Sequence, residues 1–442
     1  MRNFKALAAV FTAALLLNAC SLTDQYFGET EPPPLPGERE AILELGRGPV
    51  ADPEIASIPV SPPPARNVDW PVAGAEPSHG GGHLAWSANP TLAWQVDAGA
   101  GAKDEARRVL STPIVSDDQI FVLDAVLNVR ALNSQTGQQL WAVNSAPEDE
   151  EDGFGGGLAT DGQRVYVAGG HSQALALNAN DGSLVWRVQL PGPARAAPTL
   201  ADGLVIVSTA NNVVTALDPA DGRRRWILPG AVQGASLLGG ATPAVANDAV
   251  IAALSTGELV AMRADNGREL WRASLGSIRR FDFGTKLSDF GGSPAIADNV
   301  LYATSAAGRT AALSMRAGNR IWERRLGGMS TIWVAGDFLF LVTENAELVS
   351  LYRPDGRVRW VQPLQRFEDP EDLTGKLYYA GPVLAGGRLV VVRSNGVLAM
   401  FDPATGQPAG ELPIGERTLL PPIVAGSTLY TLSEDGTLSA FR

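Results

Sequence analysis

Residues 216–226 read ALDPADGRRRW: an apolar pair runs into a turn, and a tryptophan follows four residues after the glycine. This register decides the fold because it recurs along the chain. A seventh copy, FDPATGQPAG (401–410), has Gly410 in place of the tryptophan. The other copies are LNSQTGQQLW (132–141), LNANDGSLVW (177–186), MRADNGRELW (262–271), LSMRAGNRIW (313–322) and LYRPDGRVRW (351–360). A register that is kept so often indicates an internal structural repeat.

A second element recurs upstream of each copy, as in TPIVSDDQIFVL (112–123). It consists of a short alternating strand, a two-residue turn and a second strand, which predicts a β-hairpin. A third strand then reaches a position that is usually alanine and that recurs every 38 to 51 residues. These positions are Ala131, Ala176, Ala216, Ala261, Ala312, Ser350, Met400 and Ala440. Four short strands at this spacing are typical of a β-propeller blade.

The two ends of the repeat region complement each other. The last unit stops after three strands, at Ala440-Phe441-Arg442, whereas NPTLAWQVDAG (89–99) has a tryptophan strand with no hairpin before it. Pairing these two segments closes the ring and leaves no free edge between the first and last units. The sequence therefore predicts an all-β fold, an eight-bladed propeller of four-stranded antiparallel blades over residues 89–442.

The repeated residues have structural roles. An Asp-Gly or Asn-Gly turn supplies the positive φ that a tight hairpin requires. The small residue opposite the tryptophan lets neighbouring blades approach, and the indole fills the space between them, burying on the order of 200 Å². We predict this inter-blade role for Trp94, Trp141, Trp186, Trp226, Trp271, Trp322 and Trp360.

The first 88 residues differ in composition from the repeats. Residues 1–19 combine a basic start with the apolar run ALAAVFTAALLL (6–17), and LNAC (17–20) resembles a bacterial lipobox, which implies lipidation of Cys20 and an outer-membrane anchor. Residues 20–66 are rich in proline and predict a tether. Residues 67–88, with Trp70 and Trp86, predict a strap packed across the propeller.

Charge and chemistry-bearing residues exclude several functions. Lys+Arg minus Asp+Glu is 35 − 47 = −12, which argues against nucleic-acid binding. His79 and His83 are four residues apart, as in some metal sites, but no cysteine or acidic cluster accompanies them. The run PEDEEDGFGGG (147–157) lacks the register of a calcium loop. We expect no metal, no cofactor and no catalytic residue.

Two families share this repeat. Dehydrogenases that use pyrroloquinoline quinone (PQQ) hold the quinone and Ca²⁺ in the centre of such a ring, and the chain resembles them in its tryptophan repeat. Lipobox, proline-rich tether and trimmed blades together resemble the BamB family, lipoproteins of the outer-membrane β-barrel assembly (BAM) machinery. That resemblance implies a non-catalytic, monomeric scaffold facing the periplasm. It also implies binding to the POTRA domains of BamA, contact with other BAM lipoproteins through the complex, and delivery of unfolded outer-membrane proteins.

The resemblance also implies where BamA would bind. Two long connectors, 227–242 and 272–293, join adjacent blades on one face, and in the BamB family they contact BamA. Leu237 matches the leucine of the family pattern, whereas Leu238 replaces an arginine and Ala235 replaces a leucine. In the second connector Lys286 and Asp289 match, and Gly291 replaces an aspartate. The implied contacts are therefore Ala235, Leu237, Leu238, Lys286 and Asp289, with the lost charge moved to Arg279 or Arg280.

Three hypotheses remain open from the sequence: the assembly scaffold, a quinone enzyme or ligand sensor, and an envelope propeller with an unrelated partner. The connector 361–381 is acidic and aromatic, and it provides a candidate second binding surface.

Overall fold

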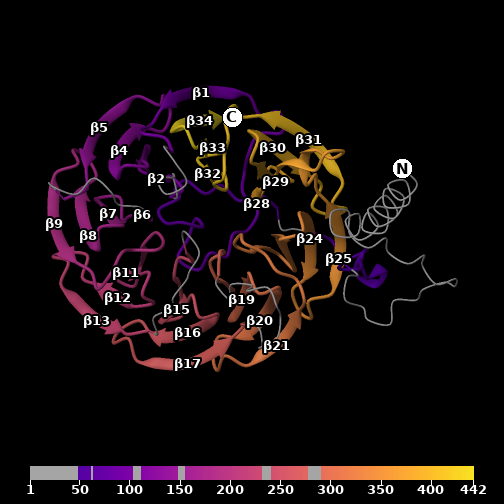
Figure 1. The fold of residues 1–442 in the computed structure, drawn as a ribbon, viewed down its shortest axis with the longest axis horizontal. Coiled ribbons are helices and arrows are strands. Elements are labelled where there is room, and N and C mark those ends of the chain that lie inside the picture. The colour runs from indigo at the N-terminus through magenta and orange to yellow at the C-terminus, as the bar shows by residue number, and fades with distance from the viewer. Residues whose placement is uncertain (1–47, 61–62, 103–110, 148–154, 231–239, 277–289) are drawn as a thin grey trace, which may run out of the picture. The chain divides into compact units, whose positions relative to one another are not determined.

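The computed structural model describes residues 48–60, 63–102, 111–147, 155–230, 240–276 and 290–442. The chain divides into a first unit, Met1–Gly48, and a second unit, Pro49–Arg442. Eight four-stranded antiparallel sheets form a ring in this unit (Figure 1), so the predicted eight-bladed propeller is confirmed. Within the described residues, no helix has the length and apolar character needed to cross a membrane.

Each blade runs from an inner strand beside the central axis to an outer strand at the rim. Blade one contains β2 (Ile114–Ser116), β3 (Gln119–Leu123), β4 (Asn128–Asn133) and β5 (Gln139–Asn144). Blade two contains β6 (Gly156–Thr160), β7 (Arg164–Gly169), β8 (Gln173–Asn178) and β9 (Leu184–Gln189). Blade three contains β10 (Thr199–Ala201), β11 (Leu204–Ser208), β12 (Val214–Leu217) and β13 (Arg224–Leu228). Blade four contains β14 (Ala244–Ala246), β15 (Ala249–Ala253), β16 (Glu258–Arg263) and β17 (Glu269–Ser274).

The second half of the ring repeats this order, with one addition. Blade five contains β18 (Ala295–Ala297), β19 (Val300–Ser305), β20 (Arg309–Ser314) and β21 (Arg320–Arg324). Blade six contains β22 (Trp333–Ala335), β23 (Phe338–Val342), β24 (Glu347–Tyr352) and β25 (Val358–Pro363). A hairpin, β26 (Phe367–Asp369) and β27 (Thr374–Lys376), precedes blade seven, which contains β28 (Tyr379–Ala385), β29 (Arg388–Arg393), β30 (Val397–Phe401) and β31 (Pro408–Pro413).

Blade eight closes the ring with strands from both ends of the repeat region. β32 (Ile423–Ala425), β33 (Thr428–Leu432) and β34 (Thr437–Phe441) pair in order, and β1 (Leu92–Asp97) adds the outer strand. Trp94 lies opposite Ala440, the register predicted from the repeat. Backbone hydrogen bonds between Thr91 and Arg442 extend the pairing beyond the strands, at 2.8 and 3.0 Å.

The core lies between blades rather than at one centre. Each of five buried apolar clusters joins two successive blades, and a larger one joins blades six, seven, eight and one with residues 70–86. The tryptophans complete these junctions: the ideal Cβ of Gly222 would lie 2.7 Å from the ring of Trp186. Alanine at that glycine would therefore force the blades apart. Six indole nitrogens donate to a carbonyl of the next blade: Trp141 to Ala179, Trp186 to Pro219, Trp226 to Ala264, Trp271 to Met315, Trp322 to Arg353 and Trp360 to Pro403.

The closing junction, between blades eight and one, differs from these six. Trp94 packs over Gly137, but its indole nitrogen has no hydrogen-bond partner among the described residues. The carbonyl of Ser134, at the equivalent position, accepts from the hydroxyl of Tyr430 at 3.1 Å and from Arg442 at 3.3 Å. Ring closure therefore uses a tyrosine and an arginine where the other junctions use an indole.

The strap, residues 67–88, crosses the propeller and bonds to seven of the eight inner strands or their adjoining turns. The bonds join Asn67 to Gly426, Trp70 to Val115, Pro71 to Thr160, Pro77 to Val245, Ser78 to Ile296, Gly82 to Val334 and Leu84 to Leu384, all at 2.7 to 2.9 Å. Trp70 also stacks on Trp333, with ring centroids 6.4 Å apart. The strap thus ties blades that are far apart in the ring.

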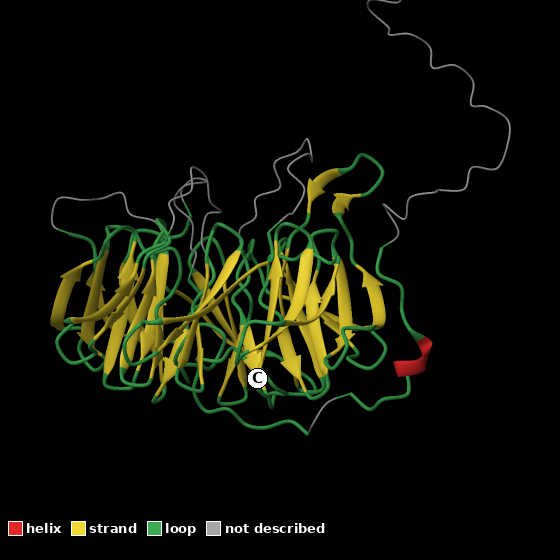
Figure 2. Cartoon of the chain, turned by 90° about the horizontal axis from the view of Figure 1, so that it is seen from below, coloured by secondary structure: helices red, strands yellow, loops and turns green. Residues whose placement is uncertain are grey.

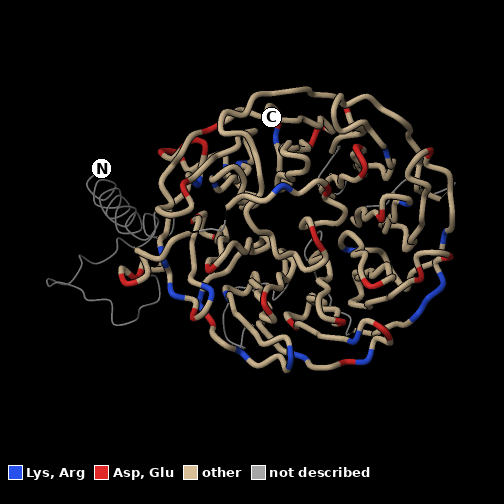
Figure 3. Tube along the Cα trace, turned by 180° about the vertical axis from the view of Figure 1, so that it is seen from behind, with Lys and Arg blue, Asp and Glu red and all other residues tan. Residues whose placement is uncertain are grey.

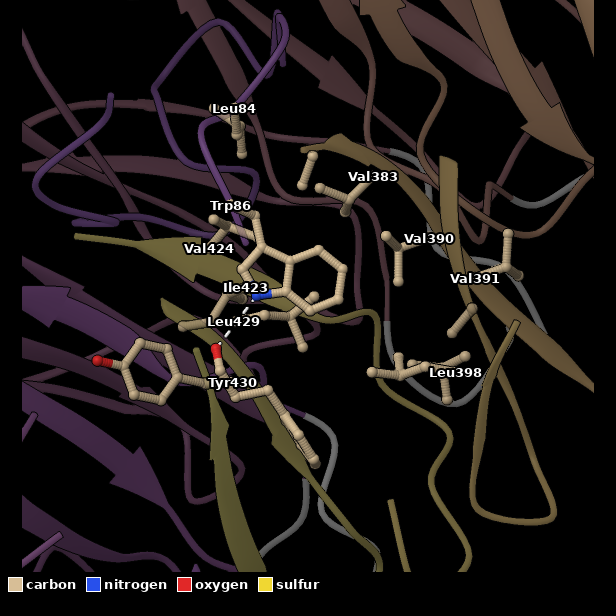
Figure 4. Close-up of a cluster of buried hydrophobic side chains, with 14 of the residues drawn as sticks. Leu84, Trp86, Val383, Val390, Val391, Leu398, Ile423, Val424, Leu429 and Tyr430 are labelled. Carbon is tan, nitrogen blue, oxygen red and sulfur yellow. Dashed lines mark hydrogen bonds between the residues drawn. The ribbon is translucent and has the colours of Figure 1, made fainter. Parts of the chain in front are cut away.

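Trp86 fills the junction between blades seven and eight, where the repeat lacks its tryptophan (Figure 4). Gly410 there lies opposite Met400, so the usual large and small residues have exchanged sides. The Trp86 indole is 7 % exposed and donates to the carbonyl of Phe441 at 3.1 Å. The Arg388 guanidinium lies 5.5 Å from its ring centroid. The strap therefore supplies an indole that the repeat itself does not.

A segment before the strap lies on the rim of blade six. Its 3₁₀ turn η1 (Pro53–Ile55) is capped by Asp52, whose backbone nitrogen donates to the carbonyl of Val358 at 2.7 Å. The Ile55 side chain is 1 % exposed. The sequence assigns these residues to the tether; the structure shows that residues 52–58 pack against the propeller, and Figure 2 shows η1 at the edge of the ring.

Candidate partner-binding face

The two faces of the ring have different loops. Turns inside the hairpins and before each tryptophan strand lie on the face that the strap crosses. The connectors between blades, where the structure describes them, lie on the opposite face, the connector face, where hairpin β26–β27 stands above the ring (Figure 2). Because a rigid scaffold presents these longer loops together, the connector face is the candidate binding surface.

Cys20 and all seven residues predicted to contact BamA lie outside the described residues. The seven are Ala235, Leu237, Leu238, Arg279, Arg280, Lys286 and Asp289. The structure does describe the ends of both connectors: the first leaves β13 after Leu228 and enters β14 at Ala244, and the second leaves β17 after Ser274 and enters β18 at Ala295.

The returning ends of the two connectors lie side by side. The backbone nitrogen of Thr242 donates to the hydroxyl of Ser293 at 2.9 Å, and the nitrogen of Ser293 donates to the hydroxyl of Thr331 at 3.0 Å. These bonds join blades four, five and six at the base of the connector face. The connectors therefore return at adjacent points, as their positions in successive blades predict.

Phe290 anchors the second connector, and sequence reasoning missed it. Its side chain is fully buried in the apolar cluster between blades four and five. Gly292, two residues later, passes so close to Ser330 that a Cβ would lie 2.3 Å from its carbonyl oxygen. The sequence signal for this anchor was an aromatic residue directly before two glycines, because glycine permits a close approach of the backbone beside a buried side chain.

Hairpin β26–β27 forms a further part of the connector face. Leu373 at its tip is 64 % exposed and Tyr378 at its base is 49 % exposed. A groove of about 250 Å³ lies beneath it, between the hairpin, blade six and the connector that enters blade six, and Met329 and Phe367 are among its lining residues. The predicted acidic and aromatic connector is thus an ordered hairpin with exposed apolar residues.

A cavity of about 370 Å³ lies at the centre of the ring, between the strap and the ends of the connectors. Trp70 and His79 line it from the strap, and Arg195, which is 6 % exposed, lines it from the approach to β10. No aspartate or glutamate is present among its described lining residues. Calcium requires several oxygen ligands, usually including carboxylates, so these residues do not fit the Ca²⁺–quinone site of PQQ dehydrogenases.

The strap histidines bond to the propeller backbone. The Nδ1 of His79 lies 2.8 Å from the carbonyl of Pro294, and the Nε2 of His83 accepts from the nitrogen of Gly387 at 2.9 Å. Nδ1 of His79 must carry a proton to donate to that carbonyl. Burial lowers the pKa of His79 below its ordinary value, opposed by the bond to Pro294 and by Glu76. Neutral His79 therefore fastens the strap to the entry of blade five.

Comparison with known proteins identifies the family. A family model described as "Outer membrane protein assembly factor BamB" matches residues 125–362, more than half of the chain. The chain belongs to the BamB family. The assembly factor BamB of Yersinia pestis is 28 % identical over 360 residues, covering 80 % of this chain and 89 % of the relative. That of Escherichia coli K12 is 28 % identical over 355 residues, covering 79 % and 88 %.

Solved structures show the same fold. BamB from Moraxella catarrhalis matches with a TM-score of 0.68 at 20 % identity, over 80 % of this chain and all of that one. A europium-containing methanol dehydrogenase matches with a TM-score of 0.67 at 12 % identity, over 85 % and 98 %. At these identities the likeness concerns architecture alone. The BamB family and the dehydrogenases thus share a propeller, and family membership rests on the sequence match.

Proposed function

We propose that this protein is a non-catalytic assembly factor of the BAM complex, which assists the insertion of outer-membrane β-barrel proteins. The observation that carries the proposal is the BamB family match across blades one to six. The central cavity supports it, because its described lining lacks the carboxylates that the quinone-enzyme alternative requires.

The proposed partner is BamA, bound through its POTRA domains on the connector face. Thr242 and Ser293 hold the returning ends of the two long connectors together, which supports one continuous surface formed by both. We assign the contacts to Ala235, Leu237 and Leu238 in the first connector, and to Arg279, Arg280, Lys286 and Asp289 in the second.

An affinity pull-down from solubilised envelopes tests the partner and the surface separately. The lipidated full chain should recover BamA. Asp289→Lys and Lys286→Glu should each reduce that recovery, whereas Asp181→Lys, a charge reversal in the turn before β9 on the opposite face, should not. Normal recovery by both connector variants would refute the contact residues. Failure of the unaltered chain to recover BamA would refute the partner.

The proposed anchor is a lipid on Cys20, with the propeller in the periplasm. Growth with a radiolabelled or alkyne-bearing palmitate should label the full chain, and Cys20→Ser should remove both the label and the association with outer-membrane fractions. A labelled Cys20→Ser chain would show that lipid attaches elsewhere.

A further inference from the structure

The outer strand of each blade has one residue that its neighbour does not pair. In blade three, Ala216 lies opposite Trp226 and Leu217 lies opposite Arg224, so Arg225 forms a bulge. The same shift occurs before each tryptophan of the repeat. A bulge re-aims its side chain, and in blades one, two, four and five the bulge residue is apolar and 43 to 50 % exposed: Leu140, Val185, Leu270 and Ile321. Only blades three and six have arginine there, as Arg225 and Arg359.

In blade six this arginine binds the segment that contains the 3₁₀ turn η1. Arg359 donates from Nη2 to the carbonyl of Ala56 at 2.7 Å and from Nη1 to the carbonyl of Ile55 at 3.3 Å, and its side chain is largely buried by the contact. Its Nε donates to the carbonyl of Ala404 in the next blade. Arg359 therefore binds backbone carbonyls of the docked segment and also links blade six to blade seven.

A second arginine of blade six, Arg357, forms ion pairs with side chains of the same segment. Nη1 of Arg357 lies 3.2 Å from the carboxylate of Asp52 and 3.1 Å from that of Glu54. The carbonyl of Val358, between the two arginines, accepts from the nitrogen of Asp52. The sequence GRVRW (356–360) thus forms a binding site on the outer strand of blade six for an acidic segment that docks as a 3₁₀ turn.

Blade three repeats this binding site and has no such segment on it among the described residues. GRRRW (222–226) places Arg223 and Arg225 in the register of Arg357 and Arg359 in GRVRW (356–360). Even the local turn is the same: the nitrogen of Arg223 donates to Asp221 at 2.9 Å, as that of Arg357 does to Asp355 at 3.0 Å. Arg225 forms an ion pair with Asp218 at 3.2 Å, and its side chain is 48 % exposed.

We propose that the rim of blade three, Arg223 to Arg225 at the start of β13, binds an acidic segment of another protein, of the type Asp-x-Glu-apolar that docks as a 3₁₀ turn at Asp52–Ile55. Positive charge favours an acidic ligand at this site. Three adjacent arginines lie at the start of the outer strand of blade three, on a rim where Lys and Arg positions gather (Figure 3). The exposed Ile227 beside them suits the apolar residue. The surface is on the outer rim, and so the proposal does not depend on BamA binding to the connector face.

A labelled synthetic peptide with the sequence of residues 49–60, PVADPEIASIPV, provides the probe. In the full chain blade six already holds this segment, so fluorescence anisotropy should report the site on blade three. Binding should weaken about tenfold in Arg225→Glu and in Arg223→Glu, and also when the peptide's aspartate and glutamate become asparagine and glutamine. It should weaken with added salt, because exposed charge pairs are screened.

Blade four provides the matched control. Arg268 occupies the position of Arg223, but Leu270 occupies that of Arg225, so Arg268→Glu should change the affinity less than twofold. The substituted arginines are exposed, and thermal unfolding checks that each variant is folded. Peptide binding that survives Arg223→Glu together with Arg225→Glu would overturn the proposal, because the peptide would then occupy blade six or another site. Concentration-dependent dimerisation abolished by Arg225→Glu would overturn the assignment to a different protein and give the site to residues 52–58 of a second copy.

Discussion

Replacing Trp86 by alanine would remove the indole that closes the junction between blades seven and eight. The side chain is 7 % exposed, so nearly the whole indole surface, on the order of 200 Å², is buried. At about 25 cal/mol per Å² this burial contributes up to about 5 kcal/mol. Substitutions of buried tryptophan by alanine typically cost about 3–5 kcal/mol, which agrees with the value from buried area.

The expected change in melting temperature follows from the size of the unit. Unfolding entropy of about 2.1 cal/mol/K per residue, over a unit of roughly 390 residues, gives about 0.8 kcal/mol/K. A loss of 3–5 kcal/mol therefore lowers the melting temperature by about 4–6 °C. Differential scanning calorimetry measures this shift, and Trp86→Phe separates the ring from the bond to Phe441, with an expected loss of about 1–2 kcal/mol.

Hydrogen exchange locates the effect. In Trp86→Ala, amides of β34 should lose protection while those of blades three and four keep it, because the Trp86 indole donates to the carbonyl of Phe441 in β34. Trp226→Ala, at a junction built from the repeat alone, should show the reverse pattern. An unchanged melting temperature and unchanged exchange in Trp86→Ala would refute the view that the strap completes the ring.

Two further perturbations test the packing and the strap. In urea unfolding, Gly267→Ala should destabilise the protein more than Gly203→Ala does, by about 1–3 kcal/mol. The φ angles of the two glycines are nearly equal, +71° and +70°, but only the Cβ added at Gly267 meets a neighbour, at 2.6 Å from the ring of Trp226. Equal losses of stability would assign the whole effect to φ. Burial lowers the pKa of His79, so its contribution to stability is present above pH 6.5 and is lost as the pH falls toward the folded-state pKa. Chemical unfolding at pH 7.5 and 5.5 should show a larger loss for the unaltered chain than for His79→Gln, and identical losses would show that His79 does not contribute.

The ring was predictable because its signals are local and repeated. A glycine at positive φ and a tryptophan four residues later recur in blades one to six, and Trp94 without a hairpin identifies the closing strand. What escaped prediction depends on contacts between segments far apart in sequence. Phe290 is buried by residues of two blades, and Asp52 meets β25 some 300 residues away. The sequence pattern within either segment does not indicate which distant residues it contacts.

The predicted partner contacts fall on connector residues whose sequence departs from the family pattern at Leu238 and Gly291. A binding loop is defined by its partner as much as by its own chain, so its residues need not follow the period of the scaffold. The scaffold around the loop was more predictable. Thr242 and Ser293 lie directly before the inner strands of successive blades, so the repeat predicts that they are neighbours.

The closure of the ring sets the order in which this fold can be completed. β1 and Trp86 are synthesised before any blade, yet their partners lie at Thr437–Phe441 and Arg442. During synthesis the first strand can therefore pair only after the last one has been made, whereas the blades between them pair with near neighbours in sequence. Removal of the last six residues would release β1, the strap tryptophan and the closing junction together. A truncation of only six residues would thus open the ring at blade eight and expose the edge of β33.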